Sequence, residues 1–151
     1  MGVKKLEIKL FEFCRPGKNI SGMQFYRRAD FLVNGERLSH SFEPLKTNPL
    51  SVSTQLDKNP PPESVIARFC GVIPEGAKPE RFVLYYVQNA ESDSLGSISC
   101  LIERDHKKIA WKDIRSEGLG QVMTYPDLVF DFEEYEAELK DYMERNPVTG
   151  S

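Results

Sequence analysis

Residues 82–114 read FVLYYVQNAESDSLGSISCLIERDHKKIAWKDI, and they contain the clearest strand patterns of the chain. Its first six residues, 82–87, form an uninterrupted aromatic and β-branched run that is typical of a central strand. Over 97–103, isoleucine and cysteine side chains alternate with the others at the period of two expected of a second strand. A polar turn at 104–108 leads to a third alternating run over 109–114. We expect these three strands to stack as an antiparallel meander.

The N-terminal part of the chain predicts a hairpin. Leucine and isoleucine alternate with charged residues over 4–13, and a second alternating run occupies 23–33. Asn34 and Gly35 follow at once, and this pair readily adopts the positive φ angles of a type I′ turn. Residues 36–43 are expected to return antiparallel, with Leu38 and Phe42 as the apolar contacts.

The segment 44–62 contains five of the ten prolines, so we expect a long loop with little regular pairing that serves either for binding or as a simple connection. Pro62 suits the first turn of a short helix, and Gly71 suits the position just after its end. The apolar stripe of this helix comprises Val65, Ile66, Phe69 and Cys70.

At the C-terminus, residues 128–130 form a short strand or staple, and Asp131 is placed to cap a helix, with Glu134 completing an acidic capping box. The apolar face of that helix comprises Phe132, Tyr135, Leu139, Tyr142 and Met143. The sequence thus predicts one α+β domain over 1–151. Its antiparallel, curved, meander-type sheet carries one short helix and a C-terminal amphipathic helix packed on one face.

Composition narrows the class of protein. Of the 151 residues, 40% are hydrophobic and 28% are charged, which is typical of a soluble globular chain. No apolar run approaches the roughly 18 residues of a membrane span, and no signal peptide is expected. The three widely spaced cysteines, Cys14, Cys70 and Cys100, favour free thiols and a cytoplasmic location.

The motifs of common catalytic and metal sites are missing from the sequence. There is no Cys-x-x-Cys or His-x-x-x-His, and His40 and His106 are the only histidines. No phosphate-binding glycine loop ends in Gly-Lys-Ser/Thr, and no Gly-x-Ser-x-Gly is present. We therefore expect no metal and no cofactor, and nothing in these patterns asks for an enzyme.

Charge is distributed unevenly along the chain. Residues 1–40 carry eight basic and four acidic side chains, a net of +4, whereas residues 131–145 carry two basic and seven acidic ones, a net of −5. An acidic helix face steers association with a basic partner. The predicted partner-binding residues are Glu133, Glu134, Glu136, Glu138 and Asp141. The alternative is a solvated amphipathic helix whose first acids merely complement the helix dipole.

Residues 81–139 resemble a bacterial family of small, largely uncharacterised cytosolic proteins. The resemblance is carried by Leu84-Tyr85-Tyr86-Val87, Gly96 with Ile98, Ile102-Glu103-Arg104, Trp111-Lys112-Asp113-Ile114, Phe130-Asp131-Phe132 and Tyr135-Glu136-Ala137, and in the first half by residues 27–35. Many relatives carry Cys-x-x-Cys-Gly-Asp followed by Cys-Gly, but the corresponding segment 88–96 here has no cysteine. The resemblance implies a shared antiparallel scaffold and supplies no reaction.

Three functions remain open. The first is a non-enzymatic protein-binding module, most concretely a bacterial immunity protein that occludes a basic toxin or nuclease domain. The second is a small-ligand binder or enzyme that uses the concave face of the sheet, with Tyr85, Trp111 and Asp113 lining a pocket. The third is a weak nucleic-acid binder. Its basic residues would be Lys4, Lys5, Lys9, Arg15, Lys18, Arg27 and Arg28.

Overall fold

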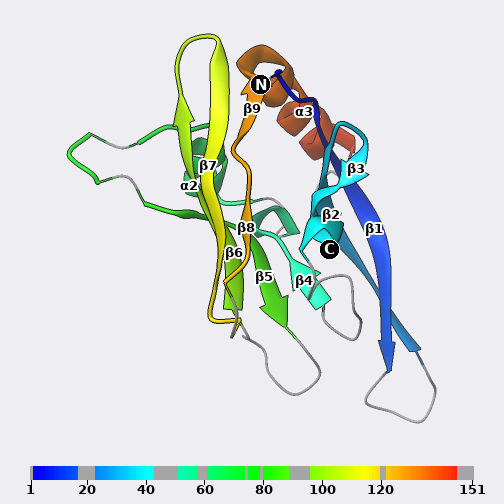
Figure 1. Cartoon of the computed structure of the whole chain (residues 1–151). Helices are drawn as coiled ribbons and strands as arrows, with labels where there is room; N and C mark the ends of the chain where they lie inside the picture. The colour runs from blue at the N-terminus through cyan, green and yellow to red at the C-terminus, as the bar shows by residue number, and fades with distance from the viewer. Residues whose placement is uncertain are drawn as a thin grey trace.

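The computed structural model describes residues 2–16, 23–42, 51–57, 61–73, 75–78, 80–88, 96–119 and 122–145. Within these ranges, two antiparallel sheets and two α-helices form an α+β fold (Figure 1). The first sheet has the order β1-β2-β3, and its strands are β1 (Leu6–Pro16), β2 (Met23–Val33) and β3 (Glu36–Arg37).

The second sheet has the order β4-β5-β6-β7-β8, and β9 also pairs with β7. Its strands are β4 (Ser51–Ser53), β5 (Phe82–Gln88), β6 (Gly96–Arg104), β7 (Lys108–Glu117), β8 (Thr124–Tyr125) and β9 (Leu128–Asp131). The predicted meander is confirmed as β5-β6-β7. The division into two sheets, by contrast, was not predicted.

The N-terminal hairpin forms as expected. β1 and β2 pair antiparallel from Leu6 opposite Val33, and Asn34 and Gly35 have φ angles of 51° and 84°, as a type I′ turn requires. The return strand is much shorter than predicted. β3 covers two residues and continues as the 3-10 helix η1 (Leu38–Ser41), which directs Leu38 into the core.

The proline-rich segment differs from the predicted loop over 51–57. Here β4 pairs with β5, and the 3-10 helix η2 (Gln55–Asp57) follows. One carboxylate stabilises this turn, because Asp57 accepts hydrogen bonds from the backbone N–H groups of Thr54 and Ala29, each at 2.6 Å. The parts of the predicted loop at 44–50 and 58–60 lie outside the described residues.

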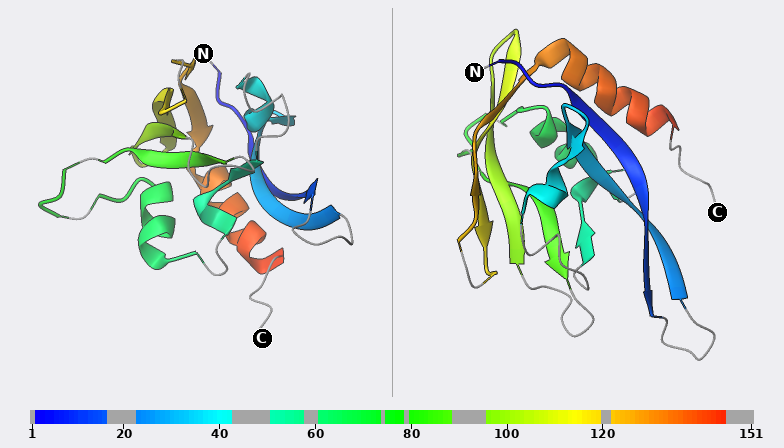
Figure 2. Two further views of the ribbon diagram at one scale, coloured as in Figure 1. Left: turned by 90° about the horizontal axis from the view of Figure 1, so that it is seen from below. Right: turned by 45° about the vertical axis from the view of Figure 1, so that its right-hand side comes forward.

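Both helices begin where the sequence predicts, and α2 also ends there. α2 (Glu63–Phe69) follows Pro62, and Gly71 just beyond it has a φ of 77°. α3 (Phe132–Arg145) is capped by Asp131, whose carboxylate accepts the N–H of Glu134 at 3.1 Å. Figure 2 shows α3 running alongside β1, in agreement with the contacts between these elements. No helix of the described residues is long and apolar enough to cross a membrane.

The core lies between the sheets and the helices and is built on aromatic rings. Phe31 of β2 contacts Trp111 of β7 at 5.3 Å between ring centroids and Phe69 of α2 at 5.8 Å. Tyr135 of α3 stacks on Phe69 at 4.9 Å, and its hydroxyl donates to the Phe69 carbonyl at 2.6 Å while accepting from the Trp111 indole at 3.1 Å. Each polar atom of this cluster is thereby satisfied, as burial demands.

A buried carboxylate joins the two sheets. Asp30 of β2 has no solvent exposure, and its oxygens accept hydrogen bonds from four donors. These are the backbone N–H of Phe31 (2.8 Å), the Arg37 guanidinium Nε (2.9 Å), and the hydroxyls of Ser39 and Tyr85. The alternation over 23–33 places Asp30 on the opposite side of the strand from Phe31, but this end of β2 is covered on both sides.

The hydrogen bonds to Asp30 lead us to expect that substitutions at this network lower the free energy of unfolding. Asp30→Asn keeps the shape but removes the charge and one acceptor, leaving four donors facing a single amide oxygen. Removing one partner of a buried ion pair costs about 3–5 kcal/mol, and we expect a loss of that size in urea denaturation. Tyr85→Phe, which removes one donor, should cost about 1 kcal/mol. Glu36→Gln, exposed in the same hairpin, is the control, and an Asp30→Asn variant as stable as this control would contradict the prediction.

Alkaline pH provides a second prediction. The Tyr142 hydroxyl donates to the Leu56 carbonyl at 3.4 Å, and burial raises its pKa from 10.0 to about 12. The folded state therefore holds this proton more tightly than the unfolded state. The resulting stabilisation is complete below pH 10 and is lost as the pH rises to about 12. Urea denaturation at stepped pH should show a shallower loss for Tyr142→Phe than for the wild type. The exposed control Tyr86→Phe should follow the wild type, and equal slopes for all three proteins would refute the assignment.

Candidate functional site

The five predicted partner-binding acids all lie on α3, but the structure uses them differently. Glu138 is largely buried, and its Oε2 accepts the backbone N–H of Ile8 at 2.7 Å and the Arg145 guanidinium at 3.1 Å. Arg145 also donates to the Ile8 carbonyl at 3.3 Å. These two side chains occupy the outward-facing backbone groups of β1, where a further strand would otherwise pair. Glu138 therefore anchors α3 to the sheet.

The other acids of α3 face solvent. Glu133 and Glu134 are exposed in its first turn, while Glu136 and Asp141 form ion pairs one turn apart, with Lys140 at 3.7 Å and Arg145 at 3.1 Å. Exposed pairs of this kind contribute little to stability. With the exposed Glu144, five accessible carboxylates stand against two cations, a net charge of −3 on this side of the helix.

Of the three predicted pocket residues, two lie in the core and one lies at the surface. Tyr85 and Trp111 have no solvent exposure, and both contact Phe31, while Trp111 also packs against Phe69 and Tyr135. Rings therefore fill the face that was expected to hold a ligand. Asp113 lies at the surface, where its carboxylate pairs with Arg81 at 2.9 Å.

The reason for the outward position of Asp113 is a β-bulge. Its φ is 51°, and the register between β6 and β7 shifts at this point, so the strict alternation predicted for 109–114 is wrong beyond Trp111. Ile114 is consequently the buried residue. The Arg81 guanidinium also donates to the hydroxyl and carbonyl of Ser99 at 2.8 Å each, which ties the bulge to β6.

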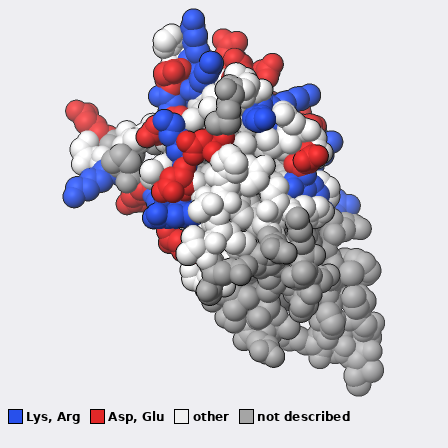
Figure 3. All heavy atoms as spheres, viewed as in Figure 1, with Lys and Arg blue, Asp and Glu red and all other residues white. Residues whose placement is uncertain are grey.

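The basic residues of the first forty show no common site. Lys9 pairs with Glu7 at 3.5 Å, and Arg27 is exposed while Arg28 is half-buried. The side chain of Arg15 and the whole of Lys18 lie outside the described residues. On the face drawn in Figure 3, basic and acidic side chains are interspersed over the described part of the surface.

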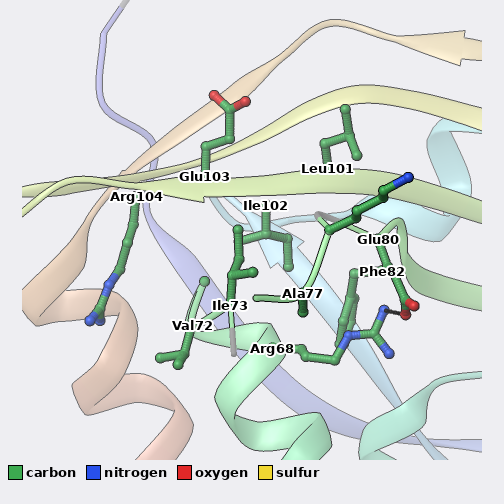
Figure 4. A pocket seen from close by; sticks show the side chains of 12 residues that line it. Arg68, Val72, Ile73, Ala77, Glu80, Phe82, Leu101, Ile102, Glu103 and Arg104 are labelled. Atoms are coloured by element: carbon green, nitrogen blue, oxygen red, sulfur yellow. Dashed lines mark ion pairs between the residues drawn. The ribbon is translucent and has the colours of Figure 1, made fainter. Parts of the chain in front are cut away.

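A cavity that the sequence did not reveal lies between the end of α2, the chain that follows it, and β6. Its volume is about 390 Å³ (Figure 4). The lining comprises Arg68, Gly71, Val72, Ile73, Ala77, Lys78, Glu80, Phe82 and residues 101–104. Val72 and Ile73 are 43% and 48% exposed, which is unusual for large apolar side chains lying next to each other. The apolar pair directly after the helix-ending Gly71 is the feature of the sequence that could have indicated this site.

The two described cysteine thiols and the two histidines lie apart from this cavity's lining. Burial raises the pKa of the Cys70 thiol and raises that of Cys100 to about 12, so both remain protonated and unreactive at neutral pH. His40 and His106 are exposed on separate turns. Within the described ranges, no group of three or more His, Cys, Asp or Glu side chains is placed to hold a metal ion.

The anchoring role of Glu138 can be separated from partner binding. Glu138→Ala removes a charged acceptor from the Ile8 amide and frees Arg145, so we expect a loss of about 1.5–3 kcal/mol in the free energy of unfolding. Amide hydrogen exchange should accelerate at Ile8 and along the last two turns of α3. Glu144→Ala, exposed on the same helix, should change stability by less than about 0.5 kcal/mol. Equal effects of the two substitutions would show that Glu138 is not an anchor.

Comparison with known proteins adds no information on this site. No protein-family model, no curated protein and no solved structure matches this chain. The resemblance drawn from the residues of 81–139 remains an expectation, and the function has to be argued from the geometry of the surface.

Proposed function

We propose that this chain is a protein-binding module, and specifically a bacterial immunity protein that neutralises a basic toxin by covering its active site. The observation that carries the proposal is the outward acidic face of α3. Glu133, Glu134 and Asp141 belong to this face, on a helix that the fold holds rigidly. Glu138 is not part of this face, because its carboxylate accepts the backbone N–H of Ile8 and anchors the helix to β1.

The rigidity of α3 supports the proposal. Asp131 caps its start, Tyr135 is hydrogen-bonded into the core, and Glu138 with Arg145 binds the backbone of β1 near its end. A helix fixed at several points loses little conformational freedom on binding, so more of the interaction energy appears as affinity. A net charge of −3 for the whole chain also suits a partner of opposite charge.

The proposed neutralisation of a toxin is tested by growth rescue. Genes that adjoin this gene are expressed singly in a bacterial host, and any toxic product is then co-expressed with the chain. We expect restored growth with one of them and a stoichiometric complex by size-exclusion chromatography. If no neighbouring product is toxic, or if a toxic one is not neutralised, the immunity proposal fails.

The role of α3 is tested with matched charge reversals. Glu133→Lys combined with Glu134→Lys should weaken the complex about tenfold or more, because like charges then face each other across the interface. Glu36→Lys combined with Glu75→Lys changes the net charge equally, at exposed sites away from α3, and should leave affinity within about twofold. Calorimetry at low and high salt measures both variants. Equal losses for the two double variants would mean that overall charge, not this helix face, drives binding.

A further inference from the structure

The cavity beside α2 has the chemistry of a ligand site that is separate from the acidic helix face. Phe82 and Ile102 are buried at its floor, and Val72 and Ile73 form an exposed apolar wall. Figure 4 shows Ile102 directed down from β6 toward the side of the cavity where these residues lie, with Arg104 at one end and Arg68 and Glu80 at the other.

The shape of the cavity follows from the end of α2. Gly71 has a φ of 77°, which permits the chain to leave the helix sharply. A β-carbon at this position would lie 3.2–3.4 Å from the side-chain carbons of Arg104, so the glycine also allows the Arg104 stem to pack closely. The guanidinium of Arg104 then lies over the Phe132 ring, 4.5 Å from its centroid. This stacking fixes the position of the cation without neutralising it.

The charges around the cavity are unbalanced in favour of cations. Both carboxylates in the lining are paired, Glu80 with Arg68 at 3.5 Å and Glu103 with Lys112 at 2.9 Å. Arg104 and Lys78 are exposed, and neither forms an ion pair with a carboxylate of the described residues. An apolar wall beside two uncompensated cations complements a molecule with an apolar body and an anionic head.

We propose that this cavity binds a free amphipathic organic anion, with a carboxylate or similar head on Arg104 and an alkyl or aryl body against Val72, Ile73 and Ile102. A guanidinium presents parallel N–H donors that match the two oxygens of a carboxylate. A volume of about 390 Å³ equals that of roughly a dozen water molecules at about 30 Å³ each, which is room for a small organic molecule. This site does not depend on the proposed toxin complex, since it uses none of the residues assigned to the acidic face.

Three probes of nearly equal size test the head group. Octanoate, octanamide and octylammonium are titrated into the ¹⁵N-labelled full chain and followed by amide chemical shifts. We expect octanoate to bind at least tenfold more tightly than octanamide, with shifts concentrated at residues 71–78 and 101–104, and octylammonium to bind more weakly than either. Equal affinity for the three probes, or shifts elsewhere on the chain, would overturn the proposal.

Two variants test separately how the anionic head and the apolar body of the ligand contribute to binding. Arg104→Met keeps the packed stem and removes the charge, so it should abolish the preference for octanoate over octanamide. Ile73→Ser, at an exposed position, should weaken both probes by a similar factor. Arg27→Met, an exposed arginine outside the cavity lining, is the control and should bind as the wild type does. A preference for octanoate that survives Arg104→Met would refute the role of Arg104.

A last measurement distinguishes a free anion from a membrane lipid. The chain is sedimented with phosphatidylcholine vesicles that do or do not contain phosphatidylglycerol. Because a cavity of this size holds a small molecule, we expect no sedimentation with either. Arg104-dependent sedimentation with the anionic vesicles, together with failure of octanoate to bind, would replace the free ligand by a lipid surface and overturn the proposal as stated.

Discussion

The buried carboxylate of Asp30 is the constraint on which the arrangement of the two sheets depends. Four donors converge on it, from β2 itself, from β3 and η1, and from Tyr85 in the other sheet. A charge at zero exposure is tolerated only where every lone pair is used, so the two sheets have to meet with these donors in register. The aromatic cluster around Phe31 and Trp111 then packs in the space that this junction defines. A parallel bridge from Lys4 to Phe130 adds a backbone link between the sheets.

This junction also determines where the surface is available for binding. Rings fill the inner face of the β5-β6-β7 meander around Trp111, so a ligand finds no room there, and the cavity lies instead where α2 ends against β6. α3 is drawn onto β1 by Glu138 and Arg145, which turns the remaining acids of the helix toward solvent. The acidic helix face and the cavity beside Arg104 use different residues and complement opposite charges.

Local chemistry in the sequence was sufficient for several elements. Asn34-Gly35 determined the hairpin turn, Asp131 the start of α3, and the run from Phe82 to Val87 the first strand of the meander. Failures occurred where the deciding interaction joins residues far apart in the chain. Asp113 does not follow the predicted alternation, because Arg81, 32 residues away, stabilises the bulge at this residue. The proline-rich segment contains β4, because residues 51–53 pair with the edge of β5.

The α+β class, the meander, the two helices and the excess of acid on the last of them could be predicted from the residues alone, because each depends on spacing or capping within a few residues. The burial of Asp30, the anchoring of α3 by Glu138 and the cavity beside Val72 and Ile73 depend on how distant segments pack. The sequence does not distinguish a carboxylate that faces solvent from one that accepts a hydrogen bond from a distant amide or lies buried between two sheets. Its role is set by the donors that the fold brings to it, and those donors lie up to 130 residues away.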